Sequence, residues 1–123
     1  MSKRVLDVGQ CDADHASISR LILEGFDAEV VRAHSDVEVM GALSSDHFDL
    51  VLINRKLDRD HSDGIDIIHQ IKSDPIVKDV AVMLVTNFAD HQALAIEAGA
   101  IPGFGKAELR DSGTREKLAS VLS

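Results

Sequence analysis

The sequence is poor in the residues and segments that define several protein classes. Its single cysteine, Cys11, cannot form an intramolecular disulfide, which is typical of a protein kept in a reducing compartment. Two prolines and eight glycines exclude a collagen-like repeat, and a hydrophobic content of 45% is too high for a disordered chain. The longest apolar run, residues 80–85, is far shorter than the roughly 20 residues that cross a bilayer. Asp7 interrupts the N-terminal apolar residues, so we expect a cytoplasmic protein with no signal peptide and no membrane contact.

Positive charge is also scarce. Thirteen basic residues stand against twenty-one acidic ones, which gives a formal net charge of −8. The longest basic cluster is the pair Arg55 and Lys56, and a chain this acidic repels the phosphate backbone of nucleic acids. We therefore expect no nucleic-acid partner. A length of 123 residues corresponds to a single domain, 1–123, with no output domain.

Short apolar runs alternate along the chain with segments of helical periodicity. Strands are predicted at residues 4–8, 28–33, 48–53, 80–85 and 101–104, and three of them are rich in Val, Ile and Leu, as burial on both faces of a sheet requires. A last helix is predicted to begin near Ser112 or Thr114. Three other helices are predicted from apolar residues at three- and four-residue spacing: Ile18, Leu21 and Ile22; Val37, Met40 and Leu43; Ile65, Ile68 and Ile71. A further helix is predicted where Leu94 and Ile96 follow Asp90. This alternation predicts an α/β fold with a doubly wound parallel sheet and helices on both faces.

The carboxyl ends of the predicted strands are the places to look for a site, because binding and chemistry in a doubly wound sheet occur there. The residues that follow the strands are Gln10, Cys11 and Asp12, then Asn54, Arg55 and Lys56, then Thr86 and Asn87, and finally Lys106. The histidines away from these ends are expected at the surface, since none has metal-ligand spacing: His34, His47, His61, His69 and His91. Cys11 and His15, four residues apart, are too few ligands for a structural metal site.

These residues and their order resemble the receiver domain of two-component response regulators, over residues 4–122. The matching stretches are residues 10–15, 48–54 with Asp63 and Gly64 after them, 83–86, and 99–106. Thr86 follows Asn54 by 32 positions and Lys106 follows Thr86 by 20, which fits the family's layout. The resemblance implies a flavodoxin-like (βα)5 fold with five parallel strands in the order 2-1-3-4-5.

The resemblance also implies a set of site positions. In the family, an aspartate after the third strand accepts a phosphoryl group from a histidine kinase, two acids after the first strand help to hold Mg²⁺, a Thr or Ser binds the phosphoryl oxygens, and a Lys neutralises them. The corresponding residues are Asn54 at the acceptor position, Gln10 and Cys11 at the acid pair, Thr86 at the hydroxyl and Lys106 at the lysine. Phe104 takes the aromatic position of the output face formed by the fourth helix, fifth strand and fifth helix.

Three of these positions depart from the family pattern, and the departures remove the chemistry. The neutral carboxamide of Asn54 is a poor nucleophile toward phosphorus. Mg²⁺ prefers oxygen ligands that include carboxylates, whereas Gln10, Cys11, Asn54 and Lys106 sum to a positive charge that Asp12 would only neutralise. We expect no phosphorylation of Asn54, weak or absent Mg²⁺ binding, no other cofactor and no enzymatic activity. The chain is thus predicted to be an atypical receiver, or pseudo-receiver.

Three residues have both a structural and a functional interpretation. Thr86 is a β-branched residue at the end of a strand, where such residues are common, and Lys106 can be a surface lysine near an acid such as Asp12. Asp7 lies among apolar residues of the first strand, and we favour a position near the strand end or a hydrogen-bonding partner, because an unpaired buried carboxylate is costly. The alternative for Asp7 is a buried acid with a raised pKa that acts as a proton or ligand sensor.

The leading hypothesis is a stand-alone receiver-like module of bacterial signalling that acts through protein–protein interaction without phosphorylation. Its expected partner is a histidine kinase, another regulator or a second copy, the last as a homodimer through the fourth helix, fifth strand and fifth helix. Two alternatives stay open. One is a working phosphorelay receiver that uses another acid such as Asp12 or Asp58. The other is a small-molecule or redox sensor that uses the altered pocket around Asp7, Cys11 and Asn54.

Overall fold

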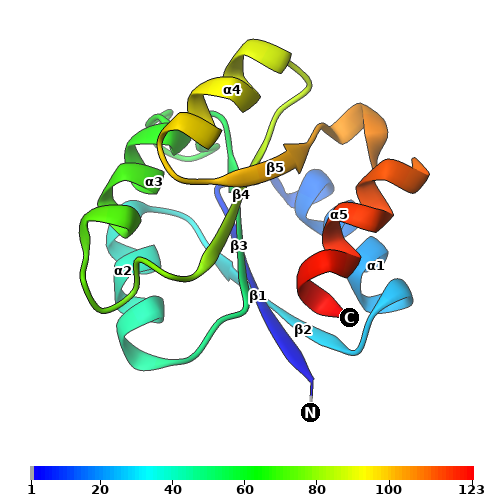
Figure 1. Ribbon diagram of the computed structural model, residues 1–123, viewed down its shortest axis with the longest axis horizontal. Coiled ribbons are helices and arrows are strands. Elements are labelled where there is room, and N and C mark those ends of the chain that lie inside the picture. The colour runs from blue at the N-terminus through cyan, green and yellow to red at the C-terminus, as the bar shows by residue number, and fades with distance from the viewer. Residues whose placement is uncertain (1) are drawn as a thin grey trace.

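A computed structural model describes residues 2–123 as one sheet with helices on both faces (Figure 1). The strands are β1 (Lys3–Val8), β2 (Ala28–Ala33), β3 (Leu50–Asn54), β4 (Ala81–Val85) and β5 (Ile101–Phe104). The helices are α1 (Asp12–Gly25), α2 (Asp36–Ser45), α3 (Gly64–Ser73), α4 (Ala89–Glu97) and α5 (Ser112–Leu122), with a 3₁₀ turn, η1 (Lys106–Glu108), before α5. Within the described residues, strands and helices therefore alternate as the hydrophobic pattern predicted.

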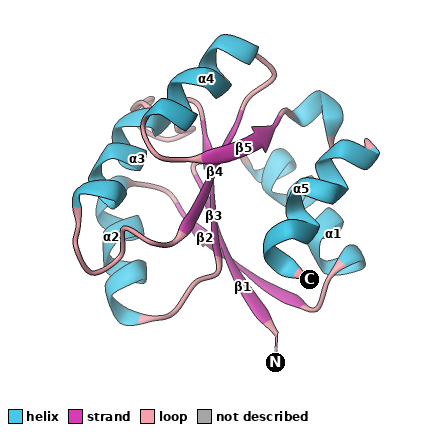
Figure 2. Ribbon diagram, viewed as in Figure 1, coloured by secondary structure: helices cyan, strands magenta, loops and turns pink. Residues whose placement is uncertain are grey.

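The sheet has the strand order β2-β1-β3-β4-β5, and every neighbouring pair of strands is parallel. Helices α1 and α5 cover one face, and α2, α3 and α4 cover the other (Figures 1 and 2). Both the flavodoxin-like fold and the predicted strand order are confirmed. From β1 the chain first adds β2 on one side and then adds β3, β4 and β5 on the other side. At this switch point of the strand order, between β1 and β3, the loops after β1 and β3 lie side by side.

Each face of the sheet buries its own hydrophobic cluster, because successive side chains of a strand point to opposite faces. The α1/α5 face buries Val5, Leu50, Leu52, Met83, Val85 and Phe104 against Ile18, Ile22, Leu118 and Leu122. The opposite face buries Leu6, Val8, Val51, Ile53, Val82 and Leu84 against Val39, Leu43, Ile67, Ile68 and Ile71. Burial of each such side chain stabilises the fold by about 1.5–3 kcal/mol relative to exposure.

Two strands begin later than the sequence predicted. The third strand was predicted at 48–53 and runs from Leu50 to Asn54. Asp49 explains its start, because the Asp49 carboxylate accepts the main-chain N–H of Arg4 (2.8 Å) in place of a main-chain carbonyl. The fourth strand was predicted at 80–85 and begins at Ala81, since the N–H of Val80 donates instead to the carbonyl of Val77 in a turn.

Two predicted helix faces were wrong in part. In α2, Val39 and Leu43 are buried, whereas Val37 is 76% exposed. In α4, the buried residue is Ala95, and the predicted pair Leu94 and Ile96 is 50% and 46% exposed. The spacing of apolar residues in the sequence does not show which side of a short helix faces the sheet. The prediction therefore assigned the exposed apolar residues of α4 to the core. No helix among residues 2–123 combines the length and the hydropathy that a membrane-spanning helix needs.

Candidate functional site

The carboxyl ends of β3 and β4 and the start of η1 enclose a shallow pocket of about 280 Å³. It is lined by Asn54, Arg55, Lys56, Val85, Thr86, Asn87, Phe88, His91 and Lys106. Three residues that the sequence placed at the site, Asn54, Thr86 and Lys106, therefore do come together. Gly64 lets α3 approach the end of β3, because a Cβ at this position would overlap the carbonyl oxygen of Asn54. We call this cavity the strand-end pocket.

Asn54 uses its side-chain amide to close the end of the sheet. Its Nδ2 donates one hydrogen bond to the carbonyl oxygen of Gly9 (3.1 Å) and another to that of Lys56 (2.8 Å). An ionised carboxylate has no hydrogen to donate, so an aspartate at this position could not bridge these two carbonyls in the same way. Asn54 is thus a structural bridge between the loops after β1 and β3.

Gln10 and Cys11 lie at the start of α1 and do not line the strand-end pocket. Gln10 is 1% exposed, and neither polar atom of its side chain has a hydrogen-bond partner in the described chain. Cys11 is the N-cap residue of α1, is partly exposed and makes no capping bond through its side chain. The two positions that the resemblance assigned to an acid pair therefore present no carboxylate to Asn54.

Thr86 is 8% exposed at the end of β4 and is held by two neighbours. Its Oγ1 accepts the main-chain N–H of Phe88 (3.3 Å) and lies 3.3 Å from Nδ1 of His91. The next residue, Asn87, accepts the N–H of Ala107 through Oδ1 (3.0 Å), which ties the loop after β4 to η1. The hydroxyl and the lysine-bearing turn are therefore fixed relative to each other.

Lys106 pairs with an acid other than the one predicted. Its Nζ lies 2.7 Å from Oδ2 of Asp14 on α1, and the hydrogen bond from Lys106 is the main reason why the pKa of Asp14 lies below its usual range. Asp12, the predicted neighbour, instead pairs with Arg32 (2.8 Å), and this bond holds the pKa of Asp12 low. The Asp12 side chain is 94% exposed and is not among the residues that line the strand-end pocket.

Asp7 is completely buried in β1 and pairs with His15 of α1. Oδ2 of Asp7 lies 2.6 Å from Nδ1 of His15, and Nε2 of His15 lies 3.4 Å from Oγ of Ser19. Burial raises the pKa of Asp7, and the hydrogen bond and charge of His15 oppose that rise. Asp7 therefore has the hydrogen-bonding partner that we favoured and also the raised pKa of the alternative. Its proposed role as a sensor stays a prediction.

The sequence analysis named Arg55, Lys56 and Asn87 among the residues that follow the strands, without a role, and the structure places all three in the strand-end pocket. It missed Phe88 and His91, which also line the pocket. Arg55 Nη1 lies 3.2 Å from Oδ1 of Asp63, the residue that caps α3. His91 was expected at the surface; it is partly exposed, and from the first turn of α4 it lines the pocket beside Thr86. Its position five residues after Thr86, in the first turn of the following helix, was the signal that could have found it.

Phe104 does not lie on an output surface, which corrects the prediction. Its ring is 1% exposed and belongs to the core between the sheet and helices α1 and α5. Ile101 and Pro102, which precede Phe104 on β5, help to form a shallow apolar cavity of about 470 Å³ against α5. It is lined by Met83, Ile101, Pro102, Gly113, Glu116, Lys117 and Ser120. Phe104 has no hydroxyl, so burial leaves none of its side-chain atoms in need of a partner.

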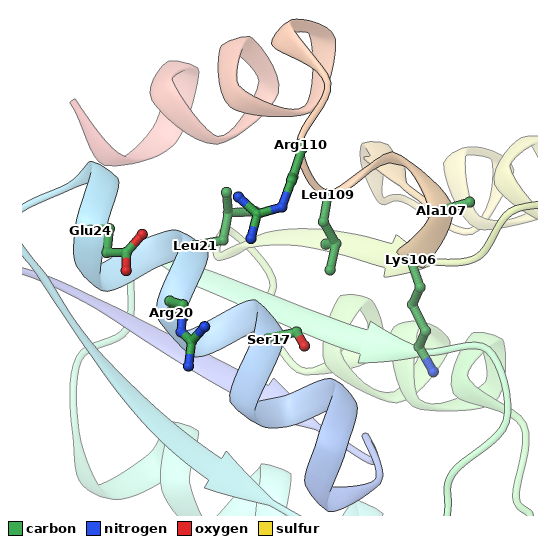
Figure 3. A pocket seen from close by; sticks show the side chains of 8 residues that line it. All are labelled: Ser17, Arg20, Leu21, Glu24, Lys106, Ala107, Leu109 and Arg110. Carbon is green, nitrogen blue, oxygen red and sulfur yellow. The ribbon is translucent and has the colours of Figure 1, made fainter.

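A further cavity of about 340 Å³ lies between α1 and η1 (Figure 3). Ser17, Arg20, Leu21 and Glu24 of α1 form one wall, and Lys106, Ala107, Leu109 and Arg110 form the other. Lys106 therefore borders both this cavity and the strand-end pocket. Among residues 2–123, no group of three or more His, Cys, Asp or Glu side chains is placed to hold a metal ion.

Comparisons with known proteins give a consistent result for the fold. No protein-family model matches the sequence, and no curated protein matches it. The structure matches 202 chains of solved structures. One is the signal receiver domain of an HD domain-containing protein from Pseudomonas fluorescens, with a TM-score of 0.81 and 19% identity over 98% of this chain and 87% of that one.

Two further matches describe response regulators. A two-component response regulator from Clostridium difficile has a TM-score of 0.79 and 15% identity, with 97% of this chain and 94% of that chain covered. The phosphorylated cyanobacterial phytochrome response regulator RcpA has a TM-score of 0.75 and 19% identity, with 98% and 91% covered. Such agreement along nearly the whole length of each chain shows that this protein has the receiver fold of response regulators.

Proposed function

We propose that this chain is an atypical receiver, a signalling module that binds other proteins and is not switched by phosphorylation of Asn54. The observation that carries the proposal is the bridge from the Asn54 amide to the carbonyl oxygens of Gly9 and Lys56. Both amide hydrogens are used in this bridge, and the amide offers no nucleophilic oxygen comparable to a carboxylate. The residue at the acceptor position thus stabilises the fold and does not take part in phosphotransfer.

The side chains that line the strand-end pocket favour weak Mg²⁺ binding. None of the described residues that line the strand-end pocket is acidic, whereas Arg55, Lys56 and Lys106 bring positive charge to it. Mg²⁺ in proteins is usually bound through one or two carboxylates. Two carboxylates pair with cations that line the pocket: Asp14 with Lys106 and Asp63 with Arg55. Phosphoryl transfer that depends on a metal at this pocket is therefore disfavoured.

The two acids considered as replacement acceptors are poorly placed for that role. Asp12 pairs with Arg32, and its side chain is 94% exposed. Asp58 is exposed in the loop after β3, where its main-chain N–H donates to the carbonyl of Gly9. Neither side chain lines the strand-end pocket beside Thr86 and Lys106. An acceptor aspartate would need these two groups next to it to neutralise the phosphoryl oxygens.

The surface of α4, β5 and α5 is the partner-binding face that we propose. Leu94 and Ile96 of α4 are about half exposed, and Ile101 and Pro102 line the apolar cavity against α5. Apolar side chains with a charged rim suit a protein–protein contact. A kinase, another regulator or a second copy would each fit. Sedimentation of the protein at a single monomeric mass over a wide concentration range would exclude the homodimer.

Intact mass after incubation with acetyl phosphate and Mg²⁺ tests the proposal. We expect the wild-type protein to keep its mass, because Asn54 cannot form an acyl phosphate. The combined variant Asn54→Asp, Gln10→Asp and Cys11→Asp is measured beside it, and a gain of one phosphoryl group by this variant alone would support the loss of the switch at these positions. A phosphoryl group on the wild-type protein would refute the proposal, and peptide mapping would then identify the acceptor.

A further inference from the structure

A cavity of about 420 Å³ opens at the amino ends of β3 and β4, at the edge of the sheet opposite to the strand-end pocket. Its walls are the loop between α2 and β3 and the loop between α3 and β4 (Figure 1). We call it the amino-end pocket. It shares no lining residue with the strand-end pocket or with the cavity between β5 and α5. Its apolar lining residues are Leu43, Phe48, Ile76, Val77, Val80 and Ala81.

Ile76 extends this apolar lining to the outside of the molecule. It is 88% exposed, the largest exposed fraction among the exposed large apolar side chains of residues 2–123. Its main-chain N–H donates to Oδ1 of Asp74 (2.9 Å), and Nζ of Lys72 donates to the carbonyl oxygens of Lys78 and Val80 (2.7 Å each). The loop that presents Ile76 to solvent is therefore fixed by side-chain hydrogen bonds. An exposed apolar residue continuous with an apolar cavity marks a contact surface.

The polar lining of the amino-end pocket is acidic. Asp46, Asp49 and Asp79 line it with His47, and none of the described residues that line it is a lysine or an arginine. Burial raises the pKa of Asp49, but the hydrogen bond from the main-chain N–H of Arg4 and the one with His47 outweigh burial and hold that pKa below its ordinary value. Asp49 is therefore ionised at neutral pH. Asp79 makes no ion pair within residues 2–123.

The cations behind the pocket do not cancel this negative charge. Arg4 pairs with Asp46 (3.6 Å) and also with Glu29 (3.4 Å), so one cation serves two carboxylates. The charge of Asp79 acts on Lys72, whose ammonium group donates its hydrogen bonds to main-chain carbonyl oxygens instead. The chain as a whole carries a net charge of −8, so its more distant residues add to the negative potential. The pocket therefore attracts a cation.

A complementary ligand joins a positive charge to a large apolar group. Complementary charge across an interface favours the correct partner and disfavours a wrong one, so a second copy of this acidic chain is a poor occupant. A small ammonium compound has room in the cavity but leaves Ile76 uncovered beside it. A protein segment covers both the cavity and Ile76, and an apolar centre with a charged rim is the usual anatomy of a protein interface.

We propose that the amino-end pocket binds a segment of another protein in which a lysine or arginine lies next to a large apolar residue. The apolar side chain packs against Phe48 and Ile76, and the cation pairs with Asp79. This surface is separate from the face of α4, β5 and α5, and it does not depend on the state of Asn54. Because the two surfaces share no residue, one molecule of this chain can contact two partners at once.

Selection from a random peptide library displayed on phage, with the full-length protein as the target, tests the inference. We expect enriched sequences in which lysine or arginine adjoins leucine, isoleucine, methionine or phenylalanine. Such a peptide, titrated into ¹⁵N-labelled protein, should give saturable shifts of the amide signals of Leu43, Ile76, Val77 and Asp79. The inference is wrong if no enriched peptide shifts these signals, or if the peptides that do so carry no cation.

Two exposed residues of the pocket give variants that keep the fold. Ile76→Ser is expected to weaken binding of the selected peptide at least about tenfold, because burial of the isoleucine side chain is lost. Asp79→Asn should weaken it about threefold to fivefold, the effect of losing one exposed ion pair. Val37→Ser and Asp66→Asn are the matched controls, since both residues are exposed and neither lines the pocket. They should bind as the wild type does, and equal weakening in a control and its pocket variant would overturn the site.

A small cation distinguishes a protein partner from a free ligand. Phenethylammonium joins a positive charge to a ring but is too small to fill the cavity and cover Ile76 as well, so it should bind more weakly than the selected peptide. Equal affinities, with no effect of Ile76→Ser on either, would overturn the protein partner in favour of a small ligand. Failure of peptide binding would leave the mass result with acetyl phosphate intact. A phosphoryl group on the wild-type protein would refute the proposed function and leave the peptide result intact.

Discussion

Replacing His15 with alanine is expected to lower the free energy of unfolding by about 3–5 kcal/mol, the usual cost of leaving one partner of a buried ion pair alone. Asp7 is fully buried, and His15 lies 2.6 Å from its Oδ2. The other oxygen, Oδ1, has no hydrogen-bond partner in the described chain. Loss of the imidazole would therefore leave the whole carboxylate unpaired in the core. Chemical denaturation of the variant and the wild type at neutral pH measures the difference.

The matched control is a second histidine–aspartate pair at the surface. His47 Nε2 lies 3.1 Å from Oδ1 of Asp49, but the His47 side chain is 82% exposed. His47→Ala should cost less than about 1 kcal/mol, because exposed ion pairs contribute little. A double variant, Asp7→Leu with His15→Leu, should recover most of the loss by removing the buried charge altogether. Equal losses in the two alanine variants would contradict the role assigned to the Asp7–His15 pair.

The same pair predicts a pH dependence. Burial raises the pKa of Asp7 above its ordinary value of 3.8. A group with a raised pKa stabilises the folded state when it is protonated, and that contribution is lost as the pH rises through its folded pKa. In His15→Ala the pKa should rise further, because the imidazole that opposes the rise is gone. The stability deficit of His15→Ala should therefore shrink between about pH 7 and about pH 4, whereas a deficit that grows on acidification would contradict this account.

A large loss of stability is also expected for Asn54→Asp, about 2–4 kcal/mol at neutral pH. The substitution removes both hydrogen bonds of the Asn54 amide and places a negative charge against the carbonyl oxygens of Gly9 and Lys56. Because deprotonation of the new carboxyl is disfavoured there, its pKa should be raised, and the loss should diminish at acidic pH. Urea denaturation at neutral and acidic pH measures both effects.

Asn87→Asp is the matched control for this substitution. Asn87 uses its side-chain oxygen, which accepts the N–H of Ala107, and a carboxylate keeps that acceptor. Asn87 is also exposed, so its variant should differ from the wild type by only about 0.5 kcal/mol. Mg²⁺ should stabilise Asn54→Asp, since the new carboxylate and two carbonyl oxygens are ligands that the ion prefers, and should not stabilise Asn87→Asp. Equal destabilisation of the two variants would show that the Asn54 bridge is not needed.

The strand-end pocket could be predicted only in part, because sequence order shows which residues follow a strand but not which of them meet. Asn54 ends a strand, Thr86 and Lys106 follow strands, and the carboxyl ends of parallel strands lie at one edge, so their meeting was foreseeable. The partner of Lys106 was not, since Asp12 and Asp14 lie on the same turn of α1 and only the orientation of the helix decides between them. The use of the Asn54 amide depends on two carbonyl oxygens that no side-chain pattern encodes.

The sequence by itself determined the fold class, because buried strands rich in Val, Ile and Leu that alternate with amphipathic helices leave few arrangements other than a doubly wound parallel sheet. It also determined that no carboxylate stands at position 54. Only the tertiary structure decided how Asp7 is accommodated, where His91 lies and that Phe104 is buried. Propensity and periodicity depend on residues a few positions apart in the sequence. These contacts instead join side chains from separate elements, and the packing of the whole core sets the distance and orientation between them.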